Sequence, residues 1–242
     1  MPKCFISETP TMGDPYLLGG EDAHHVRHVL RMTPGEALTL CTPAGMDYDC
    51  VITGFTAQEV ILRLRSCRPN TAETKEALRI YQCLPKGDKL EQVIQKSTEL
   101  GAAEIVPVQS SRCIAKLTPA TAQRKQSRWQ KIAETAAKQS GRGRIPEIPP
   151  ARSFQQALLR AAREGTVLLF YEGGGRPLRD LLAEQKGPLS LFIGPEGGFS
   201  PEEVQLAKTN GASIVTLGQR ILRTETVAPA VLSMILYARN EL

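Results

Sequence analysis

The sequence predicts an α/β protein with a mostly parallel sheet, preceded by a small β-barrel. From residue 78 onward, short apolar runs alternate with segments of helical periodicity, the order that builds a parallel sheet covered on both faces. Before residue 70, strand-like runs follow one another with turns between them, as in a small barrel or sandwich. We therefore predict two domains, residues 1–72 and residues 73–242.

Composition restricts the class of protein only broadly. The chain has 242 residues, and none of its apolar runs approaches the roughly 20 residues of a membrane span. Its start lacks the apolar stretch of a secretion signal, so we expect a cytoplasmic protein. Six cysteines without a Cys-x-x-Cys pair indicate reduced, mostly buried thiols. The net charge of +5 permits a nucleic-acid partner without requiring one.

The expected barrel contains strands at residues 37–41, 48–55 and 60–65, and one helical segment at residues 21–32. His24 and His28 lie one helical turn apart, a spacing that can hold a metal. No third ligand is near and the His-Glu-x-x-His pattern is absent, so we predict no metal. Arg27 and Arg31 on the same segment are candidates for binding RNA phosphates.

The second domain begins with a strand at residues 78–84, a turn, a helix after Asp88 and a strand at residues 105–108. Asp88 and Glu91 have the spacing of a capping box. Lys86 and Lys89 follow the first strand and are candidates for RNA contact, although a solvated turn explains them almost equally well.

A longer helix is expected at residues 118–139, followed by the basic loop Gly141-Arg142-Gly143-Arg144. Glycine lets the backbone approach a phosphate and arginine binds it bidentately, so this loop favours RNA contact over a merely solvated surface. The candidates for RNA contact in this part of the chain are Arg112, Lys138, Arg142 and Arg144.

Three loops follow predicted strands in the last third of the chain. A helix at residues 154–164 precedes a strand at 166–171, which ends in a run of glycines, and a short helix follows at 177–185. A strand at 189–193 leads through a glycine loop into a helix start marked by Ser200, Pro201 and Glu203. A third strand at 213–217 leads through a polar loop into an apolar helix at 227–237.

This arrangement predicts a ligand crevice at the carboxyl ends of the strands. The second loop is not Gly-x-Gly-x-x-Gly and lacks the Lys-Ser/Thr of a phosphate-binding loop. Glu196 lies among its glycines and would repel a phosphate, so a cationic or neutral ligand fits better. A simple turn between strand and helix would also account for one or two of these glycines.

The motif Gly194-Pro195-Glu196-Gly197-Gly198-Phe199-Ser200, followed by Leu217-Gly-x-Arg-Ile-Leu-Arg-x-Glu-Thr226, resembles the RsmE family of 16S ribosomal RNA uracil-N3 methyltransferases. This family belongs to the SPOUT superfamily. The segments His24-His-x-x-x-Val-Leu-Arg31, Lys86-Gly-Asp-Lys89 and Ser97-Thr-Glu-Leu-Gly101 resemble the same family, so the similarity covers nearly the whole chain.

The resemblance implies an N-terminal PUA-like RNA-binding barrel and a methyltransferase domain with a C-terminal trefoil knot. It also implies S-adenosylmethionine as methyl donor, 16S ribosomal RNA of the small subunit as substrate, and a homodimer formed through the knotted domain. The residues it places at the cofactor are Tyr171, Glu172, Ile193, Gly194, Pro195, Glu196, Gly197, Gly198, Leu217, Gly218, Ile221, Leu222, Arg223, Thr224, Glu225 and Thr226.

Removal of the uracil N3 proton requires a base, for which Glu225 is the first candidate and Glu196 the second. Arg223 is the candidate for neutralising the uracil oxygens. Glu225 lies at a helix start, and favourable interaction with the helix dipole explains it equally well. Two alternatives remain open: an RNA-binding module without activity, and an enzyme acting on nucleotide phosphates.

Overall fold

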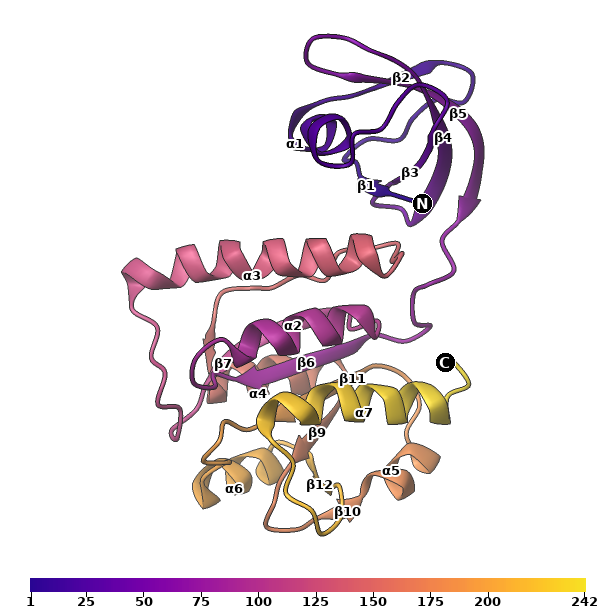
Figure 1. Cartoon of the computed structure of the whole chain (residues 1–242). Helices are drawn as coiled ribbons and strands as arrows, with labels where there is room; N and C mark the ends of the chain where they lie inside the picture. The colour runs from indigo at the N-terminus through magenta and orange to yellow at the C-terminus, as the bar shows by residue number, and fades with distance from the viewer. The chain divides into compact units, whose positions relative to one another are not determined.

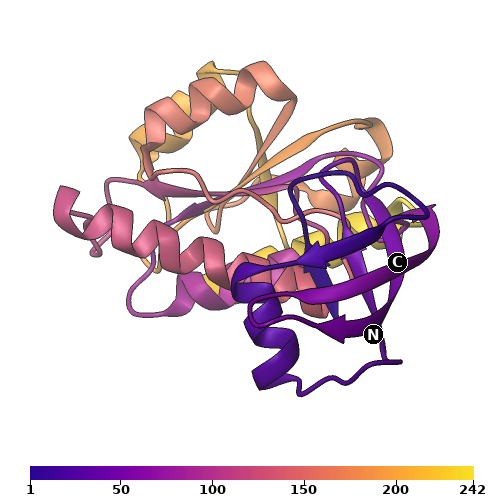
Figure 2. The same ribbon diagram turned by 90° about the horizontal axis from the view of Figure 1, so that it is seen from above.

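The computed structural model describes residues 1–242, except for the side chain of Pro119. The chain forms two compact units (Figures 1 and 2). The first contains Met1–Glu73 and Ala137–Arg144, and the second contains Thr74–Ala136 and Ile145–Leu242. None of the described helices is both long and apolar enough to cross a membrane.

A five-stranded sheet in the order β1-β3-β4-β5-β2 forms the first unit. Strands β3, β4 and β5 lie where the sequence predicts them, whereas β1 and β2 were not predicted. Strand β2 lies in a stretch rich in Gly, Pro and Thr, and the sheet pairing, not local propensity, makes it extended. The elements are β1 (Lys3–Phe5), β2 (Pro15–Leu18), α1 (Gly20–His24), the π-helical turn η1 (His25–Val29), β3 (Ala37–Cys41), β4 (Met46–Phe55) and β5 (Val60–Pro69).

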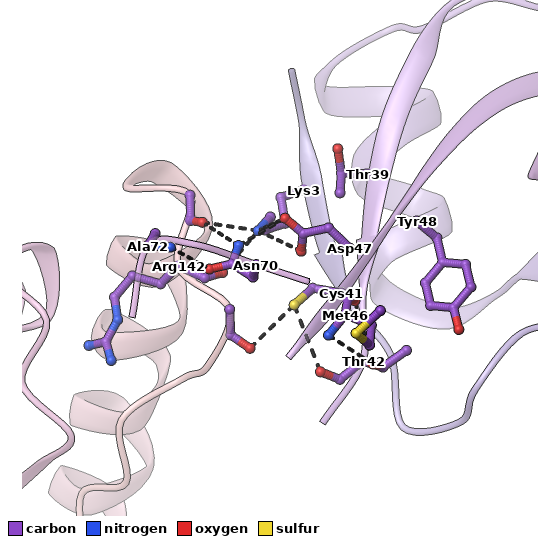
Figure 3. Close-up of polar contacts among 12 residues, drawn as sticks. Lys3, Thr39, Cys41, Thr42, Met46, Asp47, Tyr48, Asn70, Ala72 and Arg142 are labelled. Atoms are coloured by element: carbon purple, nitrogen blue, oxygen red, sulfur yellow. Dashed lines mark hydrogen bonds and ion pairs between the residues drawn. The ribbon is translucent and has the colours of Figure 1, made fainter. Parts of the chain in front are cut away.

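A polar network fixes the segment 137–144 to the sheet of the first unit (Figure 3). Lys3 Nζ donates to both carboxylate oxygens of Asp47, at 2.9 and 3.0 Å, and to the carbonyl oxygens of Gly141 and Arg142, at 3.0 Å each. Asn70 Nδ2 donates to Asp47 Oδ2 at 2.8 Å and to the Gly141 carbonyl at 3.0 Å. The buried groups of this network thus satisfy one another.

A seven-stranded sheet in the order β10-β12-β9-β11-β6-β7-β8 forms the second unit, and its strands pair in parallel as predicted. Its strands are β6 (Leu78–Cys83), β7 (Glu104–Gln109), β8 (Arg152–Ser153), β9 (Thr166–Phe170), β10 (Arg176–Pro177), β11 (Leu189–Ile193) and β12 (Ser213–Thr216). Its helices include α2 (Lys89–Glu99), α3 (Pro119–Gln139), α4 (Phe154–Glu164), α5 (Leu178–Glu184), α6 (Pro201–Thr209) and α7 (Thr224–Ala238).

Local capping determines where some of these helices begin. The predicted capping box of Ser200 and Glu203 at the start of α6 is confirmed. The one predicted at Asp88 is wrong, because Asp88 precedes α2 without a side-chain hydrogen bond to it. Glu91 instead accepts a hydrogen bond from Arg128 at 2.7 Å, a partner that the capping pattern does not reveal.

The register of the second sheet brings the carboxyl ends of four strands to one edge. Phe170 of β9 is level with Ile193 of β11 and Val215 of β12, and Ile193 is level with Gln82 of β6. Strand β12 lies between β9 and β10, which are joined only by residues 171–175. The chain therefore inserts a late strand inside an earlier connection, an arrangement consistent with the trefoil knot that the resemblance implies.

Candidate active site

The loop after β11 packs closely against the loop after β9. Gly198 has a φ of +64°, and a side chain there would collide with the carboxylate of Glu172. A Cβ at Gly194 would lie 3.2 Å from the backbone of Gly198, so the loop folds tightly on itself. Glycine is therefore required at Gly198 by both its backbone conformation and its neighbour.

Thr224, at the start of α7, ties the third loop to the second. Its Oγ1 donates to the Gly194 carbonyl at 2.7 Å and accepts from Gln82 Nε2 at 2.9 Å. Gln82 also donates to the Cys83 carbonyl at 3.0 Å. Gln82 was not among the predicted site residues, although a lone amide in the apolar strand β6 is a signal that could have identified it.

The turn after β7 supports the glycine loop from the other side. Ser111 N–H donates to Glu203 Oε1 at 2.7 Å, while Glu203 Oε2 accepts from Ser200 N–H at 3.0 Å. Arg112 donates to the Gly197 carbonyl at 2.9 Å. Arg112, predicted to contact RNA, therefore stabilises the conformation of this loop.

Lys89 brings the two candidate bases together. Its Nζ lies 2.9 Å from Glu196 Oε1 and 3.6 Å from Glu225 Oε2. Burial alone would raise the pKa of Glu196, but hydrogen bonds from Lys89 and the Lys86 N–H outweigh it, and the pKa lies below its usual value. Glu225 Oε2 is buried and accepts no hydrogen bond from the described residues.

The residues predicted to hold the cofactor lie around this edge of the second sheet and differ in their burial. Ile193, Pro195 and Thr224 are buried, and Tyr171, Gly194, Gly198, Leu217, Leu222 and Glu225 are half-buried. Exposed positions are Glu172, Glu196, Gly197, Gly218, Ile221, Arg223 and Thr226. The Arg223 guanidinium forms no ion pair with any residue that the structure describes. Within the same described residues, no three His, Cys, Asp or Glu side chains form a metal-binding group.

The predicted RNA-contact residues divide into paired and exposed ones. The prediction that Arg142 presents its guanidinium to RNA conflicts with its position: it is 2% exposed and bonds Glu73 Oε2 at 2.6 Å. Lys138 pairs with Asp22 at 2.9 Å. Arg27 donates to the Thr56 carbonyl at 2.8 Å. The exposed members of this group are Arg27, Arg31, Lys86, Arg112 and Arg144, and two of them, Arg27 and Arg112, donate to backbone carbonyls.

Known proteins share both units of this chain. Residues 72–236 match the model of an RNA methyltransferase domain, and residues 18–65 match that of an RNA methyltransferase PUA domain. The fold and the strand-end loops thus define an RNA methyltransferase-type protein with a PUA domain.

Relatives that match along nearly the full length of the chain identify the particular family. The chain is 35% identical over 239 residues to ribosomal RNA small subunit methyltransferase E of Bacillus subtilis, covering 96% of this chain and 92% of the relative. A crystal structure of this methyltransferase from Neisseria gonorrhoeae, bound to S-adenosyl methionine, superposes with a TM-score of 0.90 at 31% identity, over 98% of this chain and 97% of the other.

A putative methyltransferase from Legionella pneumophila, in complex with the cofactor SAM, has a TM-score of 0.88 at 33% identity, again over 98% and 97% of the two chains. This chain belongs to the ribosomal RNA small subunit methyltransferase E family.

Proposed function

We propose that this protein transfers a methyl group from S-adenosylmethionine to N3 of a uridine in 16S ribosomal RNA of the small subunit. The observation that carries this proposal is the carboxylate of Glu225 beside Lys89, whose Oε2 accepts no hydrogen bond from the described residues, where three strand-end loops meet. The names of the relatives support an rRNA substrate, and two solved relatives hold the same methyl donor.

The residues of the crevice suit this methyl donor. It carries a sulfonium cation, and Glu172, Glu196 and Glu225 provide three carboxylates on the loops at this edge of the sheet. Gly218 has open space where a side chain would be, and buried strand ends such as Ile193 offer backbone groups to a flat ring. When bound, S-adenosylmethionine supplies a methyl group that is activated by its positive sulfur. The residues predicted for the cofactor remain our proposal for the set that holds it.

The structure favours Glu225 over Glu196 as the base. Both oxygens of Glu196 accept hydrogen bonds from the Lys86 N–H, and Oε1 also accepts from Lys89. A carboxylate stabilised in this way is a weaker proton acceptor. No described residue donates a hydrogen bond to Glu225 Oε2, so the Glu225 carboxylate is the better candidate for taking the N3 proton. Arg223, exposed at the mouth of the crevice, remains a candidate for contacting the substrate.

We further propose a homodimer formed through the second unit, the one for which the family resemblance implies a knot. Ile221, Met234 and Tyr237 are large apolar side chains exposed on and just before α7, and a second copy of the chain would cover them. Light scattering of the purified protein tests this, and a monomer at micromolar concentration would refute it. We also propose a cytoplasmic location, because the proposed substrate is RNA of the small ribosomal subunit.

The decisive experiment uses small subunits and free 16S RNA that lack N3-methylated uridine. Each is incubated with the protein and S-adenosylmethionine, digested to nucleosides and analysed by mass spectrometry. We expect 3-methyluridine at a single position. RNA binding without any methylated nucleoside would instead support the alternative, a binding module that has the fold but not the activity.

A further inference from the structure

We propose that Lys89 determines specificity for uracil by donating to a carbonyl oxygen beside N3 and stabilising the anion that forms when N3 loses its proton. This inference rests on the proposed function and names a role for a residue that sequence analysis considered only for RNA contact.

The geometry leaves Lys89 with donors for a substrate. Its ammonium has three N–H groups, and one is directed to Glu196 Oε1 at 2.9 Å. The distance of 3.6 Å to Glu225 Oε2 is too long for a hydrogen bond. The side chains of Lys89, Glu196 and Glu225 are each about a quarter exposed, so a base can reach them.

The pair formed by Lys89 and Glu225 complements one edge of uracil. On that edge the N3–H donor is flanked by carbonyl acceptors, whereas the pair presents an acceptor, the Glu225 carboxylate, next to a donor, Lys89 Nζ. Cytosine has an acceptor at N3 and an amino donor beside it. It would direct a lone pair at the carboxylate and an amino group at the ammonium, and unpaired polar groups of this kind strongly reject a wrong ligand.

The positive charge of Lys89 suits it to stabilise the uracil anion. Its hydrogen bond to Glu196 raises the pKa of Lys89, so the ammonium stays charged at neutral pH. Loss of the N3 proton spreads negative charge onto the adjacent carbonyl oxygens. An ammonium already fixed by Glu196 can stabilise that charge without reorganising.

The test compares Lys89→Met and Lys89→Arg on 16S RNA with either uridine or 5-fluorouridine at the position that the wild type methylates. Fluorine makes the N3–H more acidic, so its ionisation needs less help. Removing one donor to a developing anion costs about 10²-fold or more in kcat, and we expect Lys89→Met to lose that much on uridine. On 5-fluorouridine the loss should be about tenfold smaller. Lys89→Arg should recover part of the rate, because it keeps charge and donors.

Two controls separate this role from others. Lys96→Met, which removes an exposed lysine paired with Glu99 on the same helix, should leave kcat and KM unchanged. Calorimetry should show that Lys89→Met binds S-adenosylmethionine within about threefold of wild type, since the lost contact is to the substrate. A much weaker cofactor affinity would mean that Lys89 only fixes the Glu196 loop, and would overturn the inference.

Other outcomes would also contradict the proposed role of Lys89. An equal loss on uridine and 5-fluorouridine, or a rise in KM alone that depends on salt, would make Lys89 a phosphate-contact residue. If the wild type produces no 3-methyluridine, the proposed function itself fails and the inference fails with it. Failure of the proposed function is seen with the wild-type protein alone. Failure of the inference is seen only when the Lys89 variants are compared with an active wild type.

Discussion

Each unit contains a cluster of lysine or arginine with carboxylates, and the two clusters differ in how completely their polar atoms are paired. In the first unit, Lys3 and Asp47 have side chains that are 7% exposed, and they bond to each other and to Asn70, Gly141 and Arg142 of the same unit. In the crevice, Glu225 has a buried oxygen that accepts no hydrogen bond from the described residues. A satisfied polar cluster stabilises the fold, whereas an unsatisfied one indicates a place for a ligand.

The basic loop at residues 141–144 shows why sequence alone could not separate Arg142, which is buried, from Arg144, which is exposed. Glycine and arginine alternate there as in a phosphate-binding loop, yet Glu73 accepts from the side chain of Arg142 and from the backbone N–H groups of Gly143 and Arg144. Glu73 lies about 70 residues away in sequence. The acid that neutralises Arg142 is therefore invisible to any local pattern.

The largest effect is expected from Glu225→Gln, which removes the charge of the carboxylate and keeps its shape. If Glu225 takes the N3 proton, turnover should fall by about 10²–10⁴-fold, the usual contribution of a general base. Raising the pH should restore part of the rate, because uridine then ionises without help. Cofactor affinity, measured by calorimetry, should be nearly intact. A normal rate would leave Glu225 only a role at the helix start, with about 0.3–1 kcal/mol of stability lost on substitution.

A similarly large effect, on stability alone, is expected from Arg142→Met in the satisfied cluster. Removing one partner of a buried ion pair costs about 3–5 kcal/mol, and the partial exposure of Glu73 places this case near the lower limit. Urea unfolding measures it. Arg144→Met is the matched control, since Arg144 is exposed, and it should change the free energy of unfolding by less than about 0.5 kcal/mol.

The pH dependence of this difference follows from Glu73. Burial would raise its pKa, but hydrogen bonds from Arg142 and the backbone of Gly143 and Arg144 outweigh it, and the pKa is lowered from 4.5. A lowered folded pKa stabilises the protein above the unfolded value and loses that stabilisation as pH falls through the folded one. The gap between wild type and Arg142→Met should therefore be full at neutral pH and shrink below 4.5. A gap that does not change with pH would contradict the pairing.

How much the sequence can predict depends on the separation of the interacting residues. Helix α4 spans the predicted residues, and the α6 start at Ser200 is also correct, because apolar periodicity and capping boxes act within a few residues. The two-residue strands β8 and β10 were missed, since nothing but pairing with a neighbour makes them strands.

The candidate site shows the same limit. Its glycine loops were predicted from local sequence, whereas Gln82 was missed because its partner Thr224 is 142 residues away. Likewise, the sequence could not rank Glu196 against Glu225. Their order rests on Lys86 and Lys89, more than 100 residues upstream of Glu196.

A moderate effect on cofactor binding is expected from Gly218→Val. A Cβ at Gly218 meets nothing within 4 Å, so the branched side chain should occupy the space proposed for the cofactor without colliding with neighbouring atoms. We expect affinity for S-adenosylmethionine to fall by about tenfold or more, equivalent to at least about 1.4 kcal/mol.

The matched control for Gly218→Val is Gly211→Val. Gly211 also has open space and a positive φ, +82° against +97° for Gly218, so both variants carry the same backbone strain. Gly211 precedes β12, at the opposite end of that strand from the crevice. If both variants lose the same affinity, the effect is strain and the proposed pocket is misplaced.

The smallest effect is expected on RNA binding outside the crevice. It comes from single cations that differ in whether a carboxylate pairs with them. Arg31 and Arg144 are exposed and form no ion pair with the described residues, whereas Lys138 is paired with Asp22. A cation that contacts a phosphate releases counterions, so neutralising it should lower the slope of log affinity against log salt by roughly one unit. Arg31→Gln and Arg144→Gln should each show this decrease in filter binding to 16S RNA, with cofactor affinity unchanged. Lys138→Met should not, because its charge is already compensated by a carboxylate.

A slope that falls equally in all three variants would mean that pairing does not decide which cations bind RNA, and an unchanged slope in all three would place the RNA on another surface.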